Sequence, residues 1–568
     1  MKNNALKSIV VIVIAFMTSC QDLDLNPLYY GSSENWYSSE EELEMSVNGL
    51  YRSVFWRLAD HTWDDDFQSR NNVSAITGGT INGETSDVGT LWTNSYKAIA
   101  RANVLLENIE KIRSLGLTEK KVKQYAAEAR FVRAAQYANL VFYFGDVVYV
   151  DSDITIEQAF KMGRMDKNLV MEKVYEDFDS AVVNLPLTYS ANEITRATKG
   201  AAYALKARRA LYNGDWALAA QAAKNCMDLG VYTLHSNFSN LFLASTRKSP
   251  ESILVFPRSI EFNSLVCAPG TVQAYVPRNR GGYASRYPSM DLFYSFLCSD
   301  GKPIDESPLF DPKMPFKNRD PRCVATIVEF GSLHLGVIYD PNPKTTHVMN
   351  YLTGRSIPNK DTKSVDQYAS YNGLILKKGI DEAWVNDNTF RVDPDLIYMR
   401  YADVLLTYAE AKIELNEIDQ TVLDAINSVR ARAYGVNLSS NSYPKVTTTN
   451  QTELRTIIRF ERRMEFAFEG LRYYDIIRWR IAEKVLNKPN YGLLDRDQLI
   501  QYVDYGYWFT PVTPEIDEDA HADLTPLYNN GFINLIVQRS FNADRQYLWP
   551  IPSKELLIND NIAQNPNY

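Results

Sequence analysis

Cysteine and histidine are scarce in this 568-residue chain, which contains five of each. Four of the cysteines are widely and irregularly spaced and form no Cys-x-x-Cys pair, which excludes the disulfide framework of a small secreted domain but leaves one bridge open. These four are Cys226, Cys267, Cys298 and Cys323. The histidines show no ligand spacing such as His-x-x-x-His. We therefore expect no metal centre and no cofactor.

Regular calcium-binding loops are also missing. Two acidic runs, Asp64–Asp66 and "PEIDEDAHAD", lack the alternating ligands of an EF-hand loop. A structural Ca²⁺ at either run stays an open alternative, but the sequence does not favour it.

The motifs of the common catalytic classes are absent as well. The chain has no Gly-x-Ser-x-Gly, no phosphate-cradling glycine loop and no reactive cysteine with a histidine nearby. A glycoside hydrolase needs only two carboxylates at the right separation, so a surface glycoside hydrolase remains an alternative. The main expectation is that the protein is not an enzyme.

Basic residues are fewer than acidic ones, with 60 Lys and Arg against 69 Asp and Glu and a net charge of −9. A nucleic-acid partner, which would need a basic stripe, is therefore not expected. Aromatic residues are plentiful, including 36 Tyr and 9 Trp. A surplus of these side chains suits a surface that binds flat, half-apolar ligands.

Only the start of the chain carries a marked apolar run, and Ile9–Phe16 is far short of the roughly 20 residues that span a bilayer. Lysines precede this run, and small residues follow it up to Cys20, as in a secretory signal peptide. The sequence Met-Thr-Ser-Cys resembles a bacterial lipobox, although Met17 stands where leucine is usual. We expect residues 1–19 to be a lipoprotein signal peptide.

Cys20 is then the lipidated N-terminus of a body that spans residues 20–568. Each acyl methylene that enters the bilayer contributes about 0.8 kcal/mol to anchoring. An ordinary signal peptide with a coincidental cysteine is the alternative.

Helical periodicity dominates two stretches, about 30–250 and 395–485. The segment "ATKGAAYALKARRALYNGDWALAAQAAKNCMDLG" predicts two helices separated by Asn213-Gly214-Asp215. Its alanines recur at i and i+4, which permits close helix crossing as in a tetratricopeptide hairpin. Further helix pairs share this style without one clean period, so we predict a mostly α fold with an irregular helical-repeat scaffold.

The composition changes in about 250–395 and 486–568, where Gly, Pro, Asn and aromatic residues become more frequent and helical periodicity is lost. Short apolar runs such as "CVATIVEF" predict a few short strands. We expect an irregular, loop-rich lobe built on the scaffold, so that residues 20–568 form a single compact unit.

One long polar segment, "ADHTWDDDFQSRNNVSAITGGTINGETSDVG", is too rich in turn formers for a helix interior. Long loops inside a compact domain are more often functional than idle. An aromatic ring excludes water from one face of a sugar while amide, carboxylate and guanidinium groups satisfy its hydroxyls. The candidate ligand-binding residues here are Trp63, Asp65, Asp66, Arg70 and Asn71. The alternative is a solvated acidic loop.

The second half of the site is expected in "YVPRNRGGYASRYPSMDLFYSF", where Tyr283 and Tyr287 are the main candidates. Gly281 and Gly282 predict an exposed loop there, whereas Tyr294 is expected to face inward. Trp92 either joins the aromatic surface or belongs to the core.

The charged motif "ERRMEFAFEGLRYYDIIRW" predicts a structural network between packed helices rather than a catalytic carboxylate pair. Steps of three, four and three residues place four charges on one helical face, where we expect them to pair. These residues are Arg462, Glu465, Glu469 and Arg472. In "NRDPRC" we expect a turn locked by ion pairs.

Several segments in this order resemble the SusD/RagB family of Bacteroidetes outer-membrane lipoproteins. They are "WTNSYKAIARAN", "AEARFVRAAQYANLVFYFGDV", "NRDPRCVATI", "RYADVLLTYAEAK", "ERRMEFAFEGLRYYDIIRW" and "WPIPSKELLINDNIAQNPNY", together with the lipoprotein-like start. Acidic residues just after Cys20 also resemble a surface-export signal. The resemblance implies about four tetratricopeptide-like helix pairs, a location at the cell surface and a SusC-like TonB-dependent barrel as partner.

The resemblance further implies a protein that binds oligosaccharides or other nutrients without cleaving them and delivers them to the barrel for import. The leading hypothesis is therefore a lipid-anchored, carbohydrate-binding protein of the outer membrane that serves polysaccharide utilization. Besides the hydrolase, the alternative is a structural lid or adaptor for the transporter whose cargo is not a glycan.

Overall fold

The structure is a computed structural model of the chain. It describes residues 36–70, 72–189, 196–247, 249–262, 269–386, 392–509 and 511–568. The predicted signal peptide, Cys20, Asn71 and Cys267 lie outside these described residues. Within them, no helix combines the length and the apolar character needed to cross a membrane.

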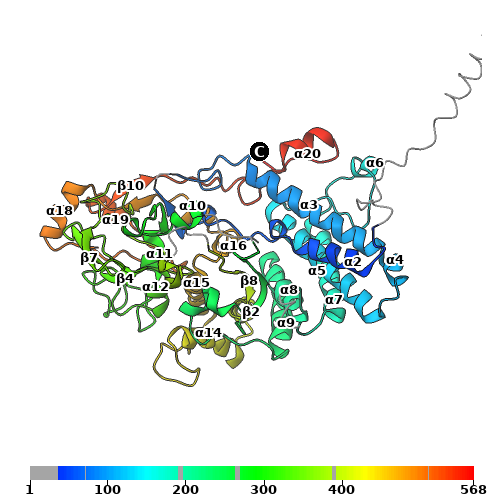
Figure 1. The fold of residues 1–568 in the computed structure, drawn as a ribbon, viewed down its shortest axis with the longest axis horizontal. Coiled ribbons are helices and arrows are strands. Elements are labelled where there is room, and N and C mark those ends of the chain that lie inside the picture. The colour runs from blue at the N-terminus through cyan, green and yellow to red at the C-terminus, as the bar shows by residue number, and fades with distance from the viewer. Residues whose placement is uncertain are drawn as a thin grey trace, which may run out of the picture.

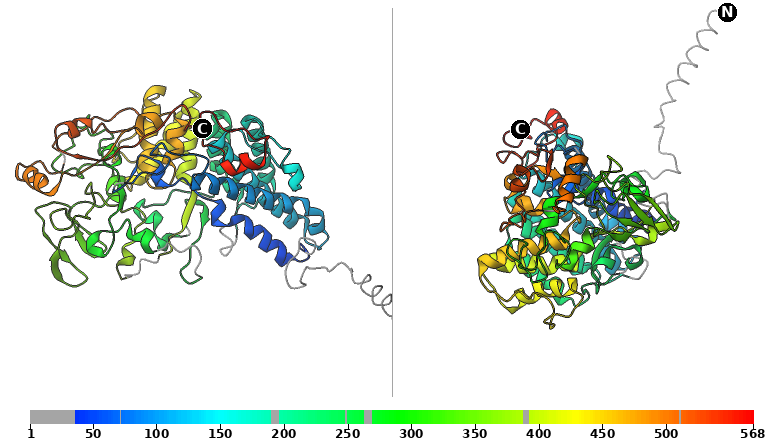
Figure 2. Two further views of the ribbon diagram at one scale, coloured as in Figure 1. Left: turned by 90° about the horizontal axis from the view of Figure 1, so that it is seen from above. Right: turned by 90° about the vertical axis from the view of Figure 1, so that its left-hand side faces the viewer.

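Helices form one side of the molecule, and an irregular lobe forms the other (Figures 1 and 2). The first helices are α2 (Glu40–Asn48), α3 (Ser86–Glu107), α4 (Ile109–Arg113), α5 (Glu119–Phe144), α6 (Ile156–Ala159), α7 (Lys167–Asn184), α8 (Lys199–Asn213) and α9 (Trp216–Asp228). Later in the chain come α13 (Tyr401–Glu414), α14 (Gln420–Ala433), α15 (Gln451–Phe466), α16 (Arg472–Arg478) and α17 (Ala482–Val485). The prediction of a mostly helical fold is confirmed.

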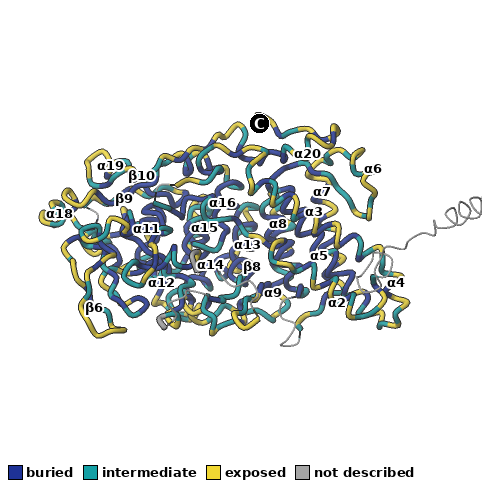
Figure 3. The backbone as a smooth tube through the Cα atoms, turned by 45° about the horizontal axis from the view of Figure 1, so that its top comes forward, coloured by how far each residue is buried: buried dark blue, intermediate teal, exposed yellow. Residues whose placement is uncertain are grey.

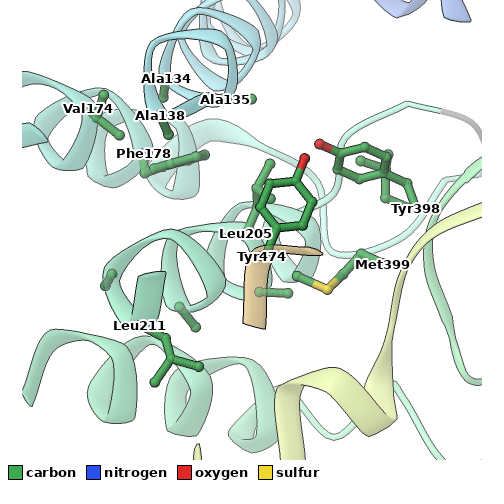
Figure 4. Packing of buried hydrophobic residues seen from close by; sticks show 14 of the residues in the cluster. Ala134, Ala135, Ala138, Val174, Phe178, Leu205, Leu211, Tyr398, Met399 and Tyr474 are labelled. Carbon is green, nitrogen blue, oxygen red and sulfur yellow. The ribbon is translucent and has the colours of Figure 1, made fainter. Parts of the chain in front are cut away.

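Neighbouring helices pack on one another in a series. Helix α5 packs on α3 and α7, α8 packs on α7 and α9, and α13 packs on α9 and α14. The predicted hairpin of α8 and α9 is confirmed: Thr198 caps the start of α8, and Gly214 ends it in the left-handed conformation with φ of 86°. Alanines make these close crossings possible; Figure 4 shows Ala134 and Ala138 of α5 facing Val174 and Phe178 of α7.

The irregular lobe contains short helices, short strands and single 3₁₀ turns. Its helices are α10 (Pro269–Gln273), α11 (Met290–Ser295), α12 (Pro321–Thr326), α18 (Arg496–Asp504) and α19 (Thr525–Asn529), and α20 (Ser553–Ile558) lies near the C-terminus. The 3₁₀ turns of the chain are η1 (Gly49–Tyr51), η2 (Ser53–Phe55), η3 (His61–Trp63), η4 (Ser239–Phe242), η5 (Ala244–Thr246), η6 (Arg278–Arg280) and η7 (Glu382–Asn386).

The strands form small antiparallel sheets. A four-stranded meander joins β4 (Ser332–His334), β5 (Val337–Tyr339), β6 (His347–Asn350) and β7 (Arg355–Pro358). Two-stranded sheets pair β1 (Phe67–Ser69) with β3 (Arg286–Pro288), β2 (Ser252–Phe256) with β8 (Leu396–Arg400), and β9 (Asn490–Gly492) with β10 (Asn534–Val537). Buried backbone continues from α3 and α5 through α13 and α15 to α11, so the two lobes share an interior (Figure 3).

The run "CVATIVEF" was expected to be a strand, and this prediction is wrong. Its first residues belong to α12, because the Asp320 side chain accepts a hydrogen bond from the Arg322 backbone N–H and Pro321 occupies the first helical turn. Asp320 also pairs with the Arg322 guanidinium at 2.8 Å, which confirms the expected ion-paired turn.

A buried charge network joins β8, α14 and α15, as expected from the charged motif. Arg400 donates hydrogen bonds to Glu251, Glu465 and Glu469 at 2.6–2.8 Å. Arg432 donates to Glu251 and Glu465 as well. We call these residues the junction network. Because its carboxylates are fully paired, the motif stabilises the packing of the two lobes.

The expected mutual pairing of Arg462, Glu465, Glu469 and Arg472 is wrong. Helix α15 ends at Phe466, and Phe468 takes the left-handed conformation with φ of 60°, so the last two residues leave the helical face. Arg462 pairs with Asp475 at 2.9 Å, and Arg472 pairs with Asp65 at 2.7 Å.

The C-terminal segment 549–568 returns to the first helices, where α20 lies beside α3 (Figure 1). The Trp549 backbone N–H donates to the Tyr143 carbonyl at 2.6 Å, and the Asn565 side chain donates to the Phe144 carbonyl at 2.9 Å. The Trp549 indole donates to the Tyr473 hydroxyl at 2.8 Å. The end of the chain thus ties the N-terminal helices to α16, and we call segment 549–568 the C-terminal strap.

Candidate ligand-binding site

The polar segment is buried from Trp63 to Gln68, so the expectation that Trp63 faces a ligand is wrong. Trp63 is 1% exposed. Its ring lies 5.0 Å from Trp549, 5.8 Å from Tyr473 and 6.3 Å from Tyr143, all in edge-on geometry. Trp63 therefore fills the core beneath the C-terminal strap and presents no face to a ligand.

Asp65 and Asp66 were predicted to contact ligand, but both are buried beside arginines. Asp65 accepts two hydrogen bonds from Arg472 at 2.7 Å and one from Arg463, and Asp66 accepts one from Arg463 at 2.9 Å. Burial acts to raise the pKa of Asp65, but the Arg472 and Arg463 guanidiniums outweigh it and hold that pKa below its usual range. Burial raises the pKa of Asp66 to about 6. Their contacts make these two carboxyl groups part of the scaffold.

The two stretches expected to form the site do lie together. Strand β1 pairs antiparallel with β3 in the register Gln68 to Tyr287 and Ser69 to Arg286. Successive side chains of a strand point to opposite faces. Tyr287 is fully buried, so its predicted role as a ligand-facing residue is wrong, whereas Arg286 borders a cavity.

Two exposed tyrosines flank Arg70, which was one of the predicted residues. Tyr283 is 44% exposed and Tyr368 is 48% exposed. The Arg70 guanidinium donates to both of their backbone carbonyls, at 2.8 Å for Tyr368, and lies 5.2 Å from the Tyr368 ring. We call Tyr283 and Tyr368 the tyrosine platform. Arg70 thus holds two aromatic rings from distant parts of the chain at one surface.

Arg278 supports the platform from the other side. Its guanidinium lies 5.9 Å from the Tyr368 ring and is fixed by Asp366 at 3.0 Å. The Arg278 guanidinium also donates to the Gly282 carbonyl at 3.1 Å. The loop that carries Tyr283 is therefore tied to the segment that carries Tyr368.

A cavity of about 410 Å³ is lined by residues of the β1–β3 sheet and shares Arg70 with the platform. Its polar lining includes Ser69, Ser74 and Ser285, and three arginines contribute to its wall, namely Arg70, Arg286 and Arg539. We call it the arginine cavity. Arg539 was missed by sequence reasoning, because it stands in the unremarkable run "IVQRSFN" with no local signal. The cavity volume lies within the range of about 300–1,000 Å³ that is typical of small-molecule sites.

A second cavity of about 690 Å³ adjoins the first at Arg286, which lines both. Aromatic side chains in its wall include Tyr275 and Phe468, and His61 lies 5.0 Å from the Phe468 ring. Burial lowers the pKa of His61 to about 4, and Lys378 and Arg286 act in the same direction. His61 is therefore neutral at physiological pH.

The structure does not bring Trp92 to the platform. Trp92 is 3% exposed and packs on Tyr96 at 4.9 Å and Phe144 at 5.0 Å. It borders a different, largely apolar cavity of about 460 Å³ near α3 and α20. The burial of Trp92 supports a place in the hydrophobic core rather than in the aromatic binding surface.

No group of three or more His, Cys, Asp and Glu side chains is arranged to hold a metal ion among the residues that the structure describes. The acidic run near residue 517 binds Lys484 through Asp517 and Asp519, at 3.0 and 2.6 Å. Three cysteines are free and buried, namely Cys226, Cys298 and Cys323.

Comparisons with known proteins cover almost the whole chain. Residues 258–568 match the family described as the SusD family, and residues 38–211 match the family described as "Starch-binding associating with outer membrane". The SusD-like protein P2 of Formosa agariphila is 25% identical over 98% of both chains.

Solved structures have the same fold. A SusD-like carbohydrate-binding protein from Bacteroides fragilis is 28% identical and superposes with a TM-score of 0.76, covering 93% of this chain and all of the other. A laminarin-binding SusD-like protein, 20% identical, has a TM-score of 0.57 and covers 93% of this chain and all of its own. At that identity the second likeness shows the fold alone.

Proposed function

The chain belongs to the SusD family, and from that premise we propose that it is a cell-surface lipoprotein that binds glycans and delivers them to a SusC-like TonB-dependent transporter. The observation that carries glycan binding is the tyrosine platform: two half-exposed tyrosines tied together by Arg70, which also lines a polar cavity. The match to a family described by its association with the outer membrane supports the location.

The platform has the chemistry that sugar rings require. The apolar face of a pyranose stacks on an aromatic plane and loses its contact with water there. In the adjoining cavity, guanidinium groups donate to the ring hydroxyls, and serine hydroxyls both donate to and accept from them. An open platform buries limited area, so affinity is modest, and tethering beside the transporter raises the effective concentration of cargo.

Removing each platform ring tests glycan binding. We expect Tyr283→Ala and Tyr368→Ala each to weaken binding of the cognate glycan about tenfold in titration calorimetry, which corresponds to about 1.4 kcal/mol. Tyr505→Ala is the matched control, because Tyr505 is 75% exposed but does not border the platform or its cavity. Unchanged affinity in both platform variants would remove these residues from the site.

The anchor and the partner are tested in cells. Radiolabelled palmitate should enter the wild-type protein and not Cys20→Ser, and added protease should digest the wild type on intact cells. Affinity purification should recover a TonB-dependent barrel with the protein. A stable complex with the barrel, combined with no heat signal for any glycan, would instead support the structural adaptor.

The hydrolase alternative has little support from the site. A glycosidase needs two carboxyl groups flanking the scissile bond, and in the acidic run beside the platform Asp65 and Asp66 are bonded to arginines. We therefore expect no new reducing ends when the purified protein is incubated with a polysaccharide panel. Release of reducing ends that disappears on substitution of a carboxylate would overturn this part of the proposal.

A further inference from the structure

Three arginines from distant parts of the sequence line the arginine cavity. Arg70 follows β1, Arg286 lies in β3, and Arg539 follows β10. None of the three forms an ion pair with a carboxylate in the part of the chain that the structure describes. Several buried arginines elsewhere are paired with carboxylates: Arg322, Arg462 and Arg463 each bind them at 2.6–3.3 Å. The cavity is thus a place where cationic groups gather without a protein counter-ion.

Arg539 is the most informative of the three, because it is only 4% exposed. Two of its nitrogens are fixed by backbone carbonyls: Nε donates to Lys488 at 2.8 Å, and Nη2 donates to Val485 at 2.9 Å. Its Nη1 has no hydrogen-bond partner among the described residues. A buried donor without a partner costs free energy, and the backbone holds this one in a fixed direction.

The other two arginines are also incompletely satisfied. The Nη2 of Arg70 donates to the backbone carbonyls of Tyr283 and Tyr368, while its buried Nε has no partner within the described chain. Arg286 makes a hydrogen bond with the Tyr275 side chain, a neutral partner. Because guanidinium groups present several donors in a planar fork, each retains donors for a further acceptor.

The nearby carboxyl groups do not balance this charge. Asp64 is the one carboxyl group in the cavity lining, against three guanidiniums, and burial together with the neighbouring Asp66 and Asp65 raises its pKa. Asp65, Asp291 and Asp64 act electrostatically on Arg539, but Asp65 and Asp291 are hydrogen-bonded to Arg463. The cavity is therefore a cationic spot on a protein whose net charge is −9.

We propose that the arginine cavity binds the anionic group of an acidic glycan, either the carboxylate of a uronic acid or a sulfate ester. This inference rests on the proposed function and names its substrate class. Guanidinium forks match the oxygens of both groups, and such charge-assisted hydrogen bonds are about twice as strong as neutral ones. The sugar ring that carries the anion then lies against the tyrosine platform, which Arg70 joins to the cavity.

Paired polymers that differ only in charge provide the test. The purified protein is titrated with polygalacturonate and with the same polymer after reduction of its carboxyl groups, and with carrageenan before and after desulfation. We expect one charged polymer to bind at least about tenfold more tightly than its neutral counterpart. The charged polymer that binds identifies the anion as carboxylate or sulfate. We also expect this difference to shrink when NaCl is raised, because salt screens charge pairs.

Variants then locate the effect. Arg286→Gln should lose about tenfold more affinity for the charged polymer than for its neutral counterpart, because the lost guanidinium pairs with the anion only in the charged one. Arg355→Gln, an exposed arginine of β7, is the matched control and should bind as the wild type does. Arg539→Lys is the second variant, because it keeps the charge while losing the fixed fork, and it should also weaken charged-polymer binding.

The failure of this inference is distinguishable from the failure of the proposed function. Equal binding of charged and neutral polymers, with both lost in Tyr283→Ala, would keep the protein a glycan binder and overturn the anionic site. No binding to any polymer in the panel would overturn both.

Discussion

Two groups of arginines in this protein have the same chemistry but opposite surroundings. In the junction network, Arg400 contacts three carboxylates and Arg432 contacts two. In the arginine cavity, Arg286 and Arg539 contact none in the described chain. Both groups include buried side chains, so burial alone does not separate them. The difference teaches that burial does not by itself give an arginine a structural role, and that several guanidiniums without a carboxylate partner around one cavity mark a candidate binding site.

The largest loss of stability is expected from a substitution in the junction network. Arg400→Met leaves Glu251, Glu465 and Glu469 buried without their shared partner, and removing one member of a buried ion pair costs about 3–5 kcal/mol. Chemical denaturation should show a loss of this size in the free energy of unfolding. Arg355→Met, at an exposed site, should change it by less than about 0.5 kcal/mol. Similar values for the two variants would contradict the structural role of the network.

Low pH should also weaken the junction network in the wild-type protein. Burial alone would raise the pKa of Glu465, but Arg432, Arg400 and Arg322 outweigh it and lower the pKa from 4.5 to about 2. Since the folded-state pKa is the lower one, the stabilisation is fully present above about pH 4.5 and is lost as the pH falls toward 2. The ionised Glu465 carboxylate therefore contributes about 3 kcal/mol to the free energy of unfolding at neutral pH.

Urea unfolding between pH 6 and pH 3 measures this loss. Glu465→Gln should remove part of the pH dependence in that interval, because its side chain does not titrate. An identical pH profile in the wild type and in this variant would show that Glu465 is not a source of acid lability.

A glycine pair sharpens the comparison at the binding surface. A Cβ atom at Gly282 would overlap the Val276 carbonyl, whereas one at Gly281 would meet no atom within 4 Å. Gly282→Ala should therefore displace the loop that carries Tyr283 and abolish measurable glycan binding. Gly281→Ala should keep most of the affinity and cost about 1 kcal/mol of stability, because φ there is 84°. Equal glycan affinity in the two variants would mean that this loop does not position the site.

The smallest effect on stability is expected at the cavity. Arg286→Gln breaks no ion pair in the described chain, so its unfolding free energy should stay within about 1 kcal/mol of the wild type. Thermal denaturation compares it directly with Arg400→Met. A loss as large as that of Arg400→Met would place Arg286 among the structural arginines and erase the distinction.

The sequence predicts the helical scaffold well because its signals are local. The alanine spacing, the turn at Gly214 and the caps of α8 each act within a few residues of where they stand. The antiparallel approach of segments 67–69 and 286–288 agrees with the expected two-part site. Family resemblance contributed the overall fold, which periodicity alone does not specify.

The exposure of individual site residues was not predictable in the same way. Asp65 finds its partners at Arg463 and Arg472, and Trp63 finds its neighbour at Trp549, hundreds of residues away. A polar run in a turn-rich segment looks the same whether it faces water or distant arginines. Arg539 illustrates the converse, because its proposed role arises only from the cavity that four separate segments line.

The C-terminal strap has a consequence for the order in which the chain acquires its structure. Trp549 fills the space among Trp63, Tyr143 and Tyr473, so the aromatic centre of the first helices stays incomplete until nearly the last residues have been synthesised. Domains generally fold as units, and this one closes only when its two ends meet. A nascent chain that lacks its final twenty residues therefore has an unfilled space among these three rings, which Trp549 fills only at the end of synthesis.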